Sequence, residues 1–236
     1  MKTLKELKSF ISEGLYDPGI FKVFFLAGGP GSGKTFITQT AFSGTGLKLV
    51  TSDPAFERGL KSANLSLKMP DEEEYFRNII RQRAKMTAST MLDTYVQGRL
   101  GLIVDATGRD LNLVTRQYNM LKSIGYDCYM IFVNTSLEVA LERQKKRERQ
   151  LPAYVVKTSW DGVQKNIGAF QRLFSPNRLL ILDNNKSDQE LVTITLNQAS
   201  KFIRSQLTKK PDNYIAKQWM QKELEARKRI WDLKIL

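Results

Sequence analysis

The segment that most constrains this chain is an octapeptide near its N-terminus, Gly28-Gly29-Pro30-Gly31-Ser32-Gly33-Lys34-Thr35. It fits the pattern G-x-x-x-x-G-K-[ST], and the apolar run 21–27 before it is typical of a buried strand. Glycines let successive backbone N–H groups point into one concavity, where the start of the following helix favours an anion. The pattern predicts a loop that binds the phosphates of a nucleoside triphosphate, with Lys34 on the β/γ oxygens and Thr35 on Mg²⁺.

The amino-acid composition excludes several classes of catalytic and metal site. The chain has 236 residues, which suits one α/β domain with extensions. It contains no histidine and one cysteine, Cys128, so disulfides, Cys/His zinc sites and histidine triads are excluded and acid–base work falls to carboxylates. No apolar run approaches the roughly 20 residues that span a bilayer, and the N-terminus lacks a signal-peptide pattern, so we expect a soluble cytoplasmic protein.

The net charge of +13 predicts an affinity for polyanions. These include nucleic acids and phosphorylated small molecules, and the charge does not choose between them. A basic surface without a specific partner stays an alternative, because no known DNA- or RNA-binding motif accompanies the charge.

The order of apolar and helical patterns predicts an α/β fold of the P-loop NTPase type. Strands that are apolar on both faces alternate with helices, which indicates a five-stranded parallel sheet in a three-layer sandwich. Capping pairs are expected at Asp71/Glu74, Thr135/Glu138 and Ser187/Glu190, and Asp110 is expected to cap a helix of its own. The expected strands cover 21–27, 47–51, 100–104, 128–133 and 179–182.

The chain ends predict two extensions. Residues 1–13 have the spacing of a short amphipathic helix, and we include them in a kinase-like domain over 1–208. Residues 209–236 mix two tryptophans and several aliphatic residues with lysine and arginine, which predicts a basic amphipathic C-terminal helix. This tail either docks onto the domain or serves as a surface for a partner or nucleic acid.

Ligands of a parallel sheet bind at the carboxyl ends of its strands. Asp53 follows the second strand, where a carboxylate can take the proton of an acceptor hydroxyl during phosphoryl transfer. Asp53 also has a structural alternative, as a cap for the helical turn expected after Pro54. Asp105 ends the third strand in a Walker B arrangement and is a second candidate ligand of Mg²⁺.

Two further groups of residues are expected near these carboxylates. Thr107 and Arg109 follow Asp105 and are expected to point into the same cleft. Arg143 and Arg147 are four residues apart, so one face of a helix end would offer two guanidinium groups, with Arg149 close by. This spacing suits an arginine lid that neutralises the transferring phosphoryl group. Lys145 and Lys146 are interpreted as a solvated face.

Four motifs in this order resemble the zeta-toxin-type P-loop kinases, a group related to polynucleotide kinases and frequent in bacteria and bacteriophages. They are the phosphate loop, Ser52-Asp53, the D-x-T-x-R of residues 105–109 and the R-x-x-x-R-x-R-x-x-P of residues 143–152. The resemblance covers about residues 20–185. It implies a kinase-type arginine lid, with Asp53 as the catalytic base.

The resemblance also implies that Thr107 and Arg109 hold the substrate, and that Arg143, with Arg147 or Arg149, contacts the phosphates of ATP. Zeta toxins phosphorylate a hydroxyl of a UDP-sugar, and their relatives phosphorylate polynucleotide ends or other hydroxyls. The tail beyond 209 and the large positive charge lie outside the family's pattern. We therefore expect the acceptor to be a hydroxyl of a nucleic acid or nucleotide, with a UDP-sugar as the alternative.

Two other functions fit parts of the sequence. Residues 105–108 match D-x-x-G and residues 185–188 match N-K-x-D, so the chain contains three GTPase signatures in order. That interpretation leaves Asp53, Arg109 and the arginine lid without roles. A non-catalytic assembly protein that binds ATP is the other alternative. We expect an ATP- and Mg²⁺-dependent kinase of unknown oligomeric state.

Overall fold

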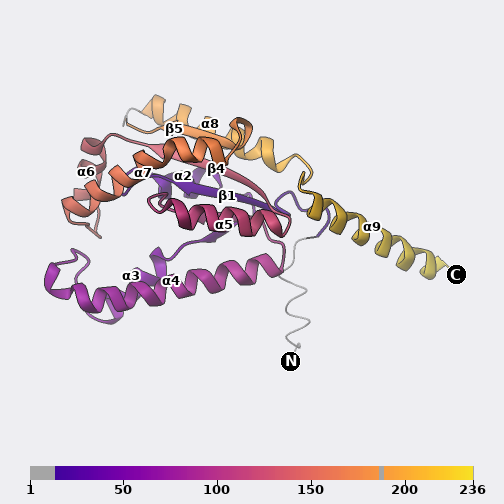
Figure 1. Cartoon of the computed structure of the whole chain (residues 1–236), viewed down its shortest axis with the longest axis horizontal. Coiled ribbons are helices and arrows are strands. Elements are labelled where there is room, and N and C mark those ends of the chain that lie inside the picture. Colours follow the sequence, from indigo (N-terminus) through magenta and orange to yellow (C-terminus); the bar gives the residue numbers. More distant parts are fainter. Residues whose placement is uncertain (1–13, 186–188, 236) are drawn as a thin grey trace.

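The chain folds around a five-stranded parallel sheet, as the sequence predicts (Figure 1). The computed structural model describes residues 14–185 and 189–235, so the helix expected over 1–13 and the cap expected at Ser187 lie outside the described residues. The strand order is β2-β3-β1-β4-β5. The strands are β1 (Lys22–Ala27), β2 (Lys48–Val50), β3 (Leu102–Asp105), β4 (Asp127–Asn134) and β5 (Leu179–Asp183).

Helices follow every strand, and together with the sheet they form three layers (Figure 1). Two short 3-10 helices precede α4 and β5. The α-helices are α2 (Lys34–Ala41), α3 (Asp53–Ser62), α4 (Glu74–Gln97), α5 (Leu111–Ser123), α6 (Leu137–Lys145), α7 (Ala153–Leu173), α8 (Gln189–Leu207) and α9 (Tyr214–Ile235), and the 3-10 helices are η1 (Asp71–Glu73) and η2 (Pro176–Arg178).

The central strand β1 is buried on both faces, and its alternating side chains belong to two separate cores. Phe25 and its neighbours on one face pack against α5 and α7. Phe24 and Leu26 on the other face pack against α2 and α8. A third, smaller core around Phe56 joins α3 to α4 and includes Leu151 from the loop before α7. Burial on both faces explains why the strands have no polar alternation.

Two buried charges at the amino end of the sheet hold the chain between α8 and α9. Lys22 and Asp127 are register partners on β1 and β4. The Lys22 ammonium donates to the carbonyl oxygens of Gln206 (2.8 Å), Leu207 (2.9 Å) and Lys209, at the end of α8. The Asp127 carboxylate accepts from Arg178 (3.1 Å) and from the backbone N–H of Asp212 (2.6 Å). The start of α9 is therefore fixed to the sheet.

The C-terminal helix α9 packs on the body through its first turns and then extends away from it (Figure 1). Ala216 is buried in the core. The Trp219 ring packs edge-on against Phe21, with ring centroids 5.6 Å apart, and lies 4.3 Å from the Arg99 guanidinium carbon. The first part of the tail is thus a helix docked by an aromatic anchor and a cation–π contact.

Several local expectations need correction. The Asp71/Glu74 capping box is wrong: η1 precedes α4, and neither helix has a side-chain cap. The Thr135/Glu138 box is also wrong, because the helix begins one residue later and Ser136 accepts from the Val139 N–H at 3.3 Å. The cap at Asp110 is confirmed.

Two helices differ in length from the expectation. The turn expected after Pro54 is the first part of the ten-residue helix α3, in which proline occupies the first turn. The helix expected to carry Arg143 and Arg147 ends at Lys145, so Arg147 lies with Arg149 in the loop after it and does not share a helix face with Arg143. None of the described helices is both long and apolar enough to cross a membrane.

We predict that Lys22→Met lowers the free energy of unfolding by about 1–3 kcal/mol, because the carbonyls at the end of α8 lose a buried donor. Chemical denaturation monitored by circular dichroism measures this change. Lys48→Met is the matched control, since Lys48 begins β2 and is exposed. Equal stability of the two variants would contradict the anchoring role of Lys22.

Candidate phosphotransfer site

The phosphate loop follows β1 at the carboxyl edge of the sheet and leads directly into α2. Its backbone is packed closely against neighbouring segments. The Gly28 N–H donates to the Thr107 carbonyl at 3.0 Å, and the buried Asn184 side chain donates to the Ser32 carbonyl at 2.7 Å. Gly31 has φ +82°, and a Cβ there would overlap the Ala140 carbonyl of α6. At Gly31 the loop thus has no room for a larger residue.

Two side chains of the loop fit a phosphate ligand. The Lys34 ammonium donates to the carbonyls of Gly28 (2.6 Å) and Gly29 (3.4 Å), so it lies across its own loop. Burial lowers the pKa of Lys34, while Asp105 and Asp53 oppose the shift. The Ser32 hydroxyl is buried and has no hydrogen-bond partner among the described residues. An unpaired donor and a cation inside a glycine-rich concavity suit the oxygens of a phosphate.

The Thr35 hydroxyl and the Asp105 carboxylate are the oxygen ligands that this chain would offer to a bound Mg²⁺. Asp105 ends β3 and is the register partner of Leu26, next to the phosphate loop. Burial raises the pKa of Asp105, and the nearby Lys34 opposes this shift. Within the described ranges, no three acidic, histidine or cysteine residues cluster to hold a metal. A hydroxyl and a carboxylate fit Mg²⁺, which keeps waters and takes phosphate oxygens as its other ligands.

Asp53 is the first residue of α3, and its carboxylate forms a two-pronged ion pair with Arg149. The two guanidinium nitrogens lie 3.2 and 3.1 Å from the two carboxylate oxygens. Neither Asp53 nor the N-cap residue Ser52 makes a side-chain cap. The structural alternative for Asp53, a helix cap, is therefore wrong. Its carboxylate faces the loop 146–152 after α6, which contains Arg147 and Arg149 and is called the arginine loop below.

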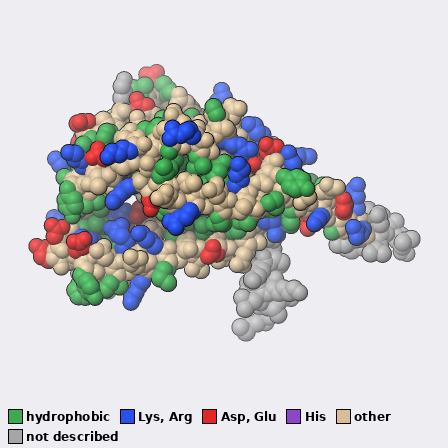
Figure 2. Space-filling model, viewed as in Figure 1, with side chains coloured by type: hydrophobic (Ala, Val, Ile, Leu, Met, Phe, Trp, Pro, Cys, Tyr) green, Lys and Arg blue, Asp and Glu red, His purple; other side chains and the backbone are tan. Residues whose placement is uncertain are grey.

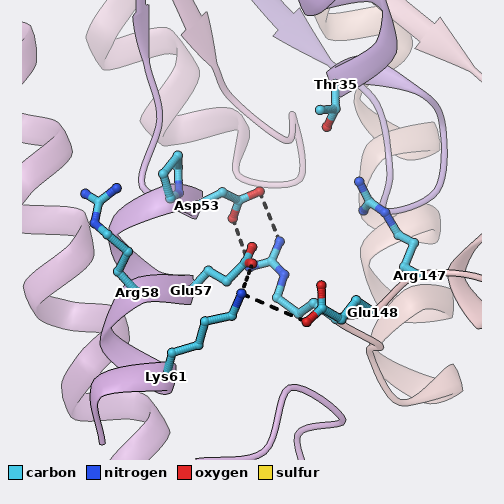
Figure 3. A pocket seen from close by; sticks show the side chains of 9 residues that line it. Thr35, Asp53, Glu57, Arg58, Lys61, Arg147 and Glu148 are labelled. Carbon is cyan, nitrogen blue, oxygen red and sulfur yellow. Dashed lines mark hydrogen bonds and ion pairs between the residues drawn. The ribbon is translucent and has the colours of Figure 1, made fainter.

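Asp53, Thr35 and the arginine loop surround one cavity of about 530 Å³ (Figure 3). The phosphate loop, α3 and the segment 147–149 each contribute to its wall. Figure 2 shows Lys and Arg side chains in the hollow between the lobe of α3 and α4 and the rest of the molecule. The lining side chains that carry charge are Asp53, Glu57, Arg58, Lys61, Arg147, Glu148 and Arg149.

The three predicted lid arginines have separate positions. Arg147 and Arg149 line the cavity. Arg143 is not among the residues that line the cavity, and it donates to the Asn184 carbonyl at 2.8 Å. Because the Asn184 amide holds Ser32, Arg143 supports the loop from outside the cavity. No pattern in the sequence predicts this role of Asn184.

Thr107 and Arg109 lie on another side of the phosphate loop. The Thr107 carbonyl accepts from Gly28, and neither side chain lines the cavity of Asp53. Arg109 packs beside Gly162 of α7, where a Cβ would lie 3.0 Å from its Cγ. Asn166 donates to the carbonyls of Gly108 and Arg109, both at 2.9 Å. Their substrate-binding role stays a prediction.

The sequence did not identify several residues that shape the site. Glu57 and Lys61 line the cavity one and two turns after Asp53, a spacing that becomes visible once α3 is known to continue past Pro54. The Trp160 indole donates to the Thr135 carbonyl at 2.7 Å and lies beside Gly29. No local signal distinguishes this tryptophan from an ordinary core residue.

This arrangement defines a P-loop kinase fold. The phosphate loop follows the central strand β1 of a parallel sheet, and on one side of β1 the strands β3 and β2 lead to Asp105 and Asp53. A family model described as an AAA domain matches residues 23–170, which is more than half of the chain. The chain belongs to this family. The comparison with curated proteins finds no match.

Solved structures with a similar fold include kinases. A candidate kinase from Chloroflexus aurantiacus is 20% identical with a TM-score of 0.57, covering 79% of this chain and 98% of that one. Shikimate kinase from Acinetobacter baumannii in complex with shikimate is 14% identical with a TM-score of 0.51, covering 83% and 98%. The AvrRxo1-ORF1:ORF2 complex with ATP is 16% identical with a TM-score of 0.56, covering 74% and 58%. The P-loop kinase fold is confirmed, whereas the kinase activity and the zeta-toxin type stay predictions.

We predict that Gly31→Ala removes the thermal protection that ATP gives, because the added Cβ displaces the loop from the Ala140 carbonyl. Gly44→Ala is the matched control: Gly44 also has positive φ (+73°), but nothing lies within 4 Å of an added Cβ. Both variants acquire backbone strain of about 1 kcal/mol. Retained ATP protection in Gly31→Ala would contradict the tight packing of the loop.

Proposed function

We propose that this protein is an ATP- and Mg²⁺-dependent phosphotransferase that moves the γ-phosphoryl group to a hydroxyl of an acceptor. One observation carries the proposal: a carboxylate, Asp53, shares a cavity with Thr35 of the phosphate loop and with three arginines, two of which are the predicted lid residues Arg147 and Arg149. A base must lie near both the acceptor hydroxyl and the transferring phosphoryl group, and a shared cavity provides this proximity.

Each side of the cavity has a separate task. Lys34 would hold the β/γ oxygens, and Thr35 and Asp105 would hold Mg²⁺, whose charge offsets that of the phosphates. Asp53 accepts the proton of the acceptor hydroxyl as the phosphoryl group transfers. The proposed lid consists of Arg143 with Arg147 or Arg149, which stabilises the negative charge on the transferring group. Thr107 and Arg109 are proposed to hold the substrate from the side of α7.

For the acceptor we favour a hydroxyl of a nucleic acid or nucleotide. The net charge of +13 and the basic lining of the cavity support this choice. A UDP-sugar is the alternative suggested by the resemblance to zeta toxins. We assign catalysis to a domain over 1–208 and a supporting role to the tail over 209–236, whose basic residues are available for a nucleic acid.

We predict that Asp53→Asn lowers kcat by about 10²–10⁴-fold, because the proton of the acceptor loses its base. The assay follows transfer of radiolabelled γ-phosphate, first screened over polynucleotides, nucleosides and nucleotide sugars. Asp93→Asn is the control, since Asp93 is exposed on α4 and is not among the residues that line the cavity. Transfer by Asp53→Asn within a few-fold of wild type would rule out this role. Retained ATP binding with no acceptor found would favour a non-catalytic assembly protein.

We predict that ATP with Mg²⁺ raises the melting temperature and that GTP does so far less. Saturation at about 100 times Kd stabilises a protein by about 2.7 kcal/mol, which a thermal melt detects. Chelation of Mg²⁺ by EDTA, or the change Thr35→Val, reduces the stabilisation by ATP. A stronger effect of GTP would favour the GTPase interpretation. Three residues of its N-K-x-D signature, 186–188, lie outside the described residues.

A further inference from the structure

Next to Asp53 lies an arginine for which neither the family resemblance nor the proposed mechanism has a use. Arg81 extends from α4 and is partly buried, with its guanidinium carbon 4.3 Å from the centre of the Phe56 ring. The Arg149 guanidinium carbon lies 5.7 Å from the centre of the same ring. One buried aromatic side chain therefore contacts two guanidinium groups, of which that of Arg149 lines the cavity and that of Arg81 lies behind the lining residues.

The charges around this ring are not balanced. Arg149 is paired with Asp53, and Arg77, which is buried one turn before Arg81, donates to the Pro70 carbonyl at 2.7 Å. Arg81 forms no hydrogen bond or ion pair with any described residue. Burial, together with the neighbouring Arg149 and Arg77, lowers the pKa of Arg81. A cation–π contact compensates only part of the cost of burying a guanidinium group, so an added anion would stabilise this cluster.

The adjoining cavity has the same imbalance. Lys61 is matched by Glu57 at 3.2 Å and Glu148 at 3.9 Å. Arg58 and Arg147 line the cavity without an ion pair to any described residue, and Figure 3 shows them extending from opposite walls. A volume of about 530 Å³ is large enough for a small phosphorylated molecule.

We propose that Arg81 and Arg149 form an anion subsite that binds a phosphate group of the acceptor, so that the acceptor is a phosphorylated molecule and not a neutral alcohol. This inference rests on the proposed function, because it assigns a substrate class to the same cavity. Arginine suits the role because its planar fork matches phosphate oxygens. A phosphate on Arg149 would also compete with Asp53, which releases the carboxylate toward the acceptor hydroxyl.

Binding, and not transfer, provides the test, so that its result is independent of the proposed reaction. The full-length protein is saturated with Mg²⁺ and a non-hydrolysable ATP analogue to occupy the phosphate loop. Calorimetry then compares matched probes: thymidine monophosphate against thymidine, and glucose phosphate against glucose. We expect at least one phosphorylated probe to bind and its neutral partner to bind at least tenfold more weakly.

Arg81→Met should lower the affinity for the phosphorylated probe roughly ten- to hundredfold, the effect of losing a charged hydrogen bond. The affinity for the ATP analogue should stay within twofold of wild type. Arg83→Met is the control, because Arg83 is exposed on the same helix and is not one of the two arginines that pack on the Phe56 ring. Arg81→Lys keeps the charge and serves if the methionine variant does not fold. It should retain part of the affinity.

Each outcome decides the inference. Unchanged binding in Arg81→Met, an equal loss in Arg83→Met, or no binding of any phosphorylated probe would overturn it. Transfer to a neutral alcohol that is insensitive to Arg81→Met would leave the proposed function standing and remove the subsite. Phosphate binding that depends on Arg81 without transfer to any acceptor would support the subsite and contradict the proposed function.

Discussion

Burial of β1 on both faces is the constraint on which the site depends. All six of its residues are buried, so their side chains are fixed by two cores at once. The strand therefore ends at a fixed point, and the phosphate loop leaves it toward α2. Neighbouring strands are in parallel register with β1, which brings Asp105 and the end of β4 to the same edge. The geometry of the phosphate loop follows from packing that contains no catalytic residue.

A second set of contacts closes the cavity from the other side. The ion pair between Asp53 and Arg149 joins α3 to the loop after α6. Three further contacts hold the same loop: the Gln150 N–H donates to the Leu67 carbonyl at 3.0 Å, Leu151 packs in the core of α3 and α4, and Gln144 donates to the Arg149 carbonyl. The exposed ion pair contributes little stability alone, but the surrounding packing sets its geometry. The arginine loop is thus positioned by the lobe that would hold the acceptor.

The sequence predicts the sheet better than the cavity, for a physical reason. Strands buried on both faces leave continuous apolar runs, so their positions, and the carboxylates that follow them, can be read locally. Asp53 and Arg149 are 96 residues apart, and no local pattern records that they meet. The end of α6 at Lys145 has no strong stop signal either. The sequence therefore predicts that Arg143 and Arg147 share a helix face. In the structure Arg147 lies in a loop, and the position of Arg149 is set by its ion pair with Asp53.

Three cations at or near the site, Lys34, Arg143 and Arg149, are paired with atoms of the chain itself in this structure. Lys34 donates to two carbonyls of its own loop, Arg143 donates to the Asn184 carbonyl, and Arg149 pairs with Asp53. A phosphate that binds Lys34 or Arg149 must replace these internal partners, so the net gain is the difference between two sets of charged hydrogen bonds. That exchange couples the two halves of the cavity. In the proposed mechanism, release of Arg149 from Asp53 would free a carboxylate oxygen as the guanidinium group turns to phosphate, so anion binding and exposure of the proposed base would be one event.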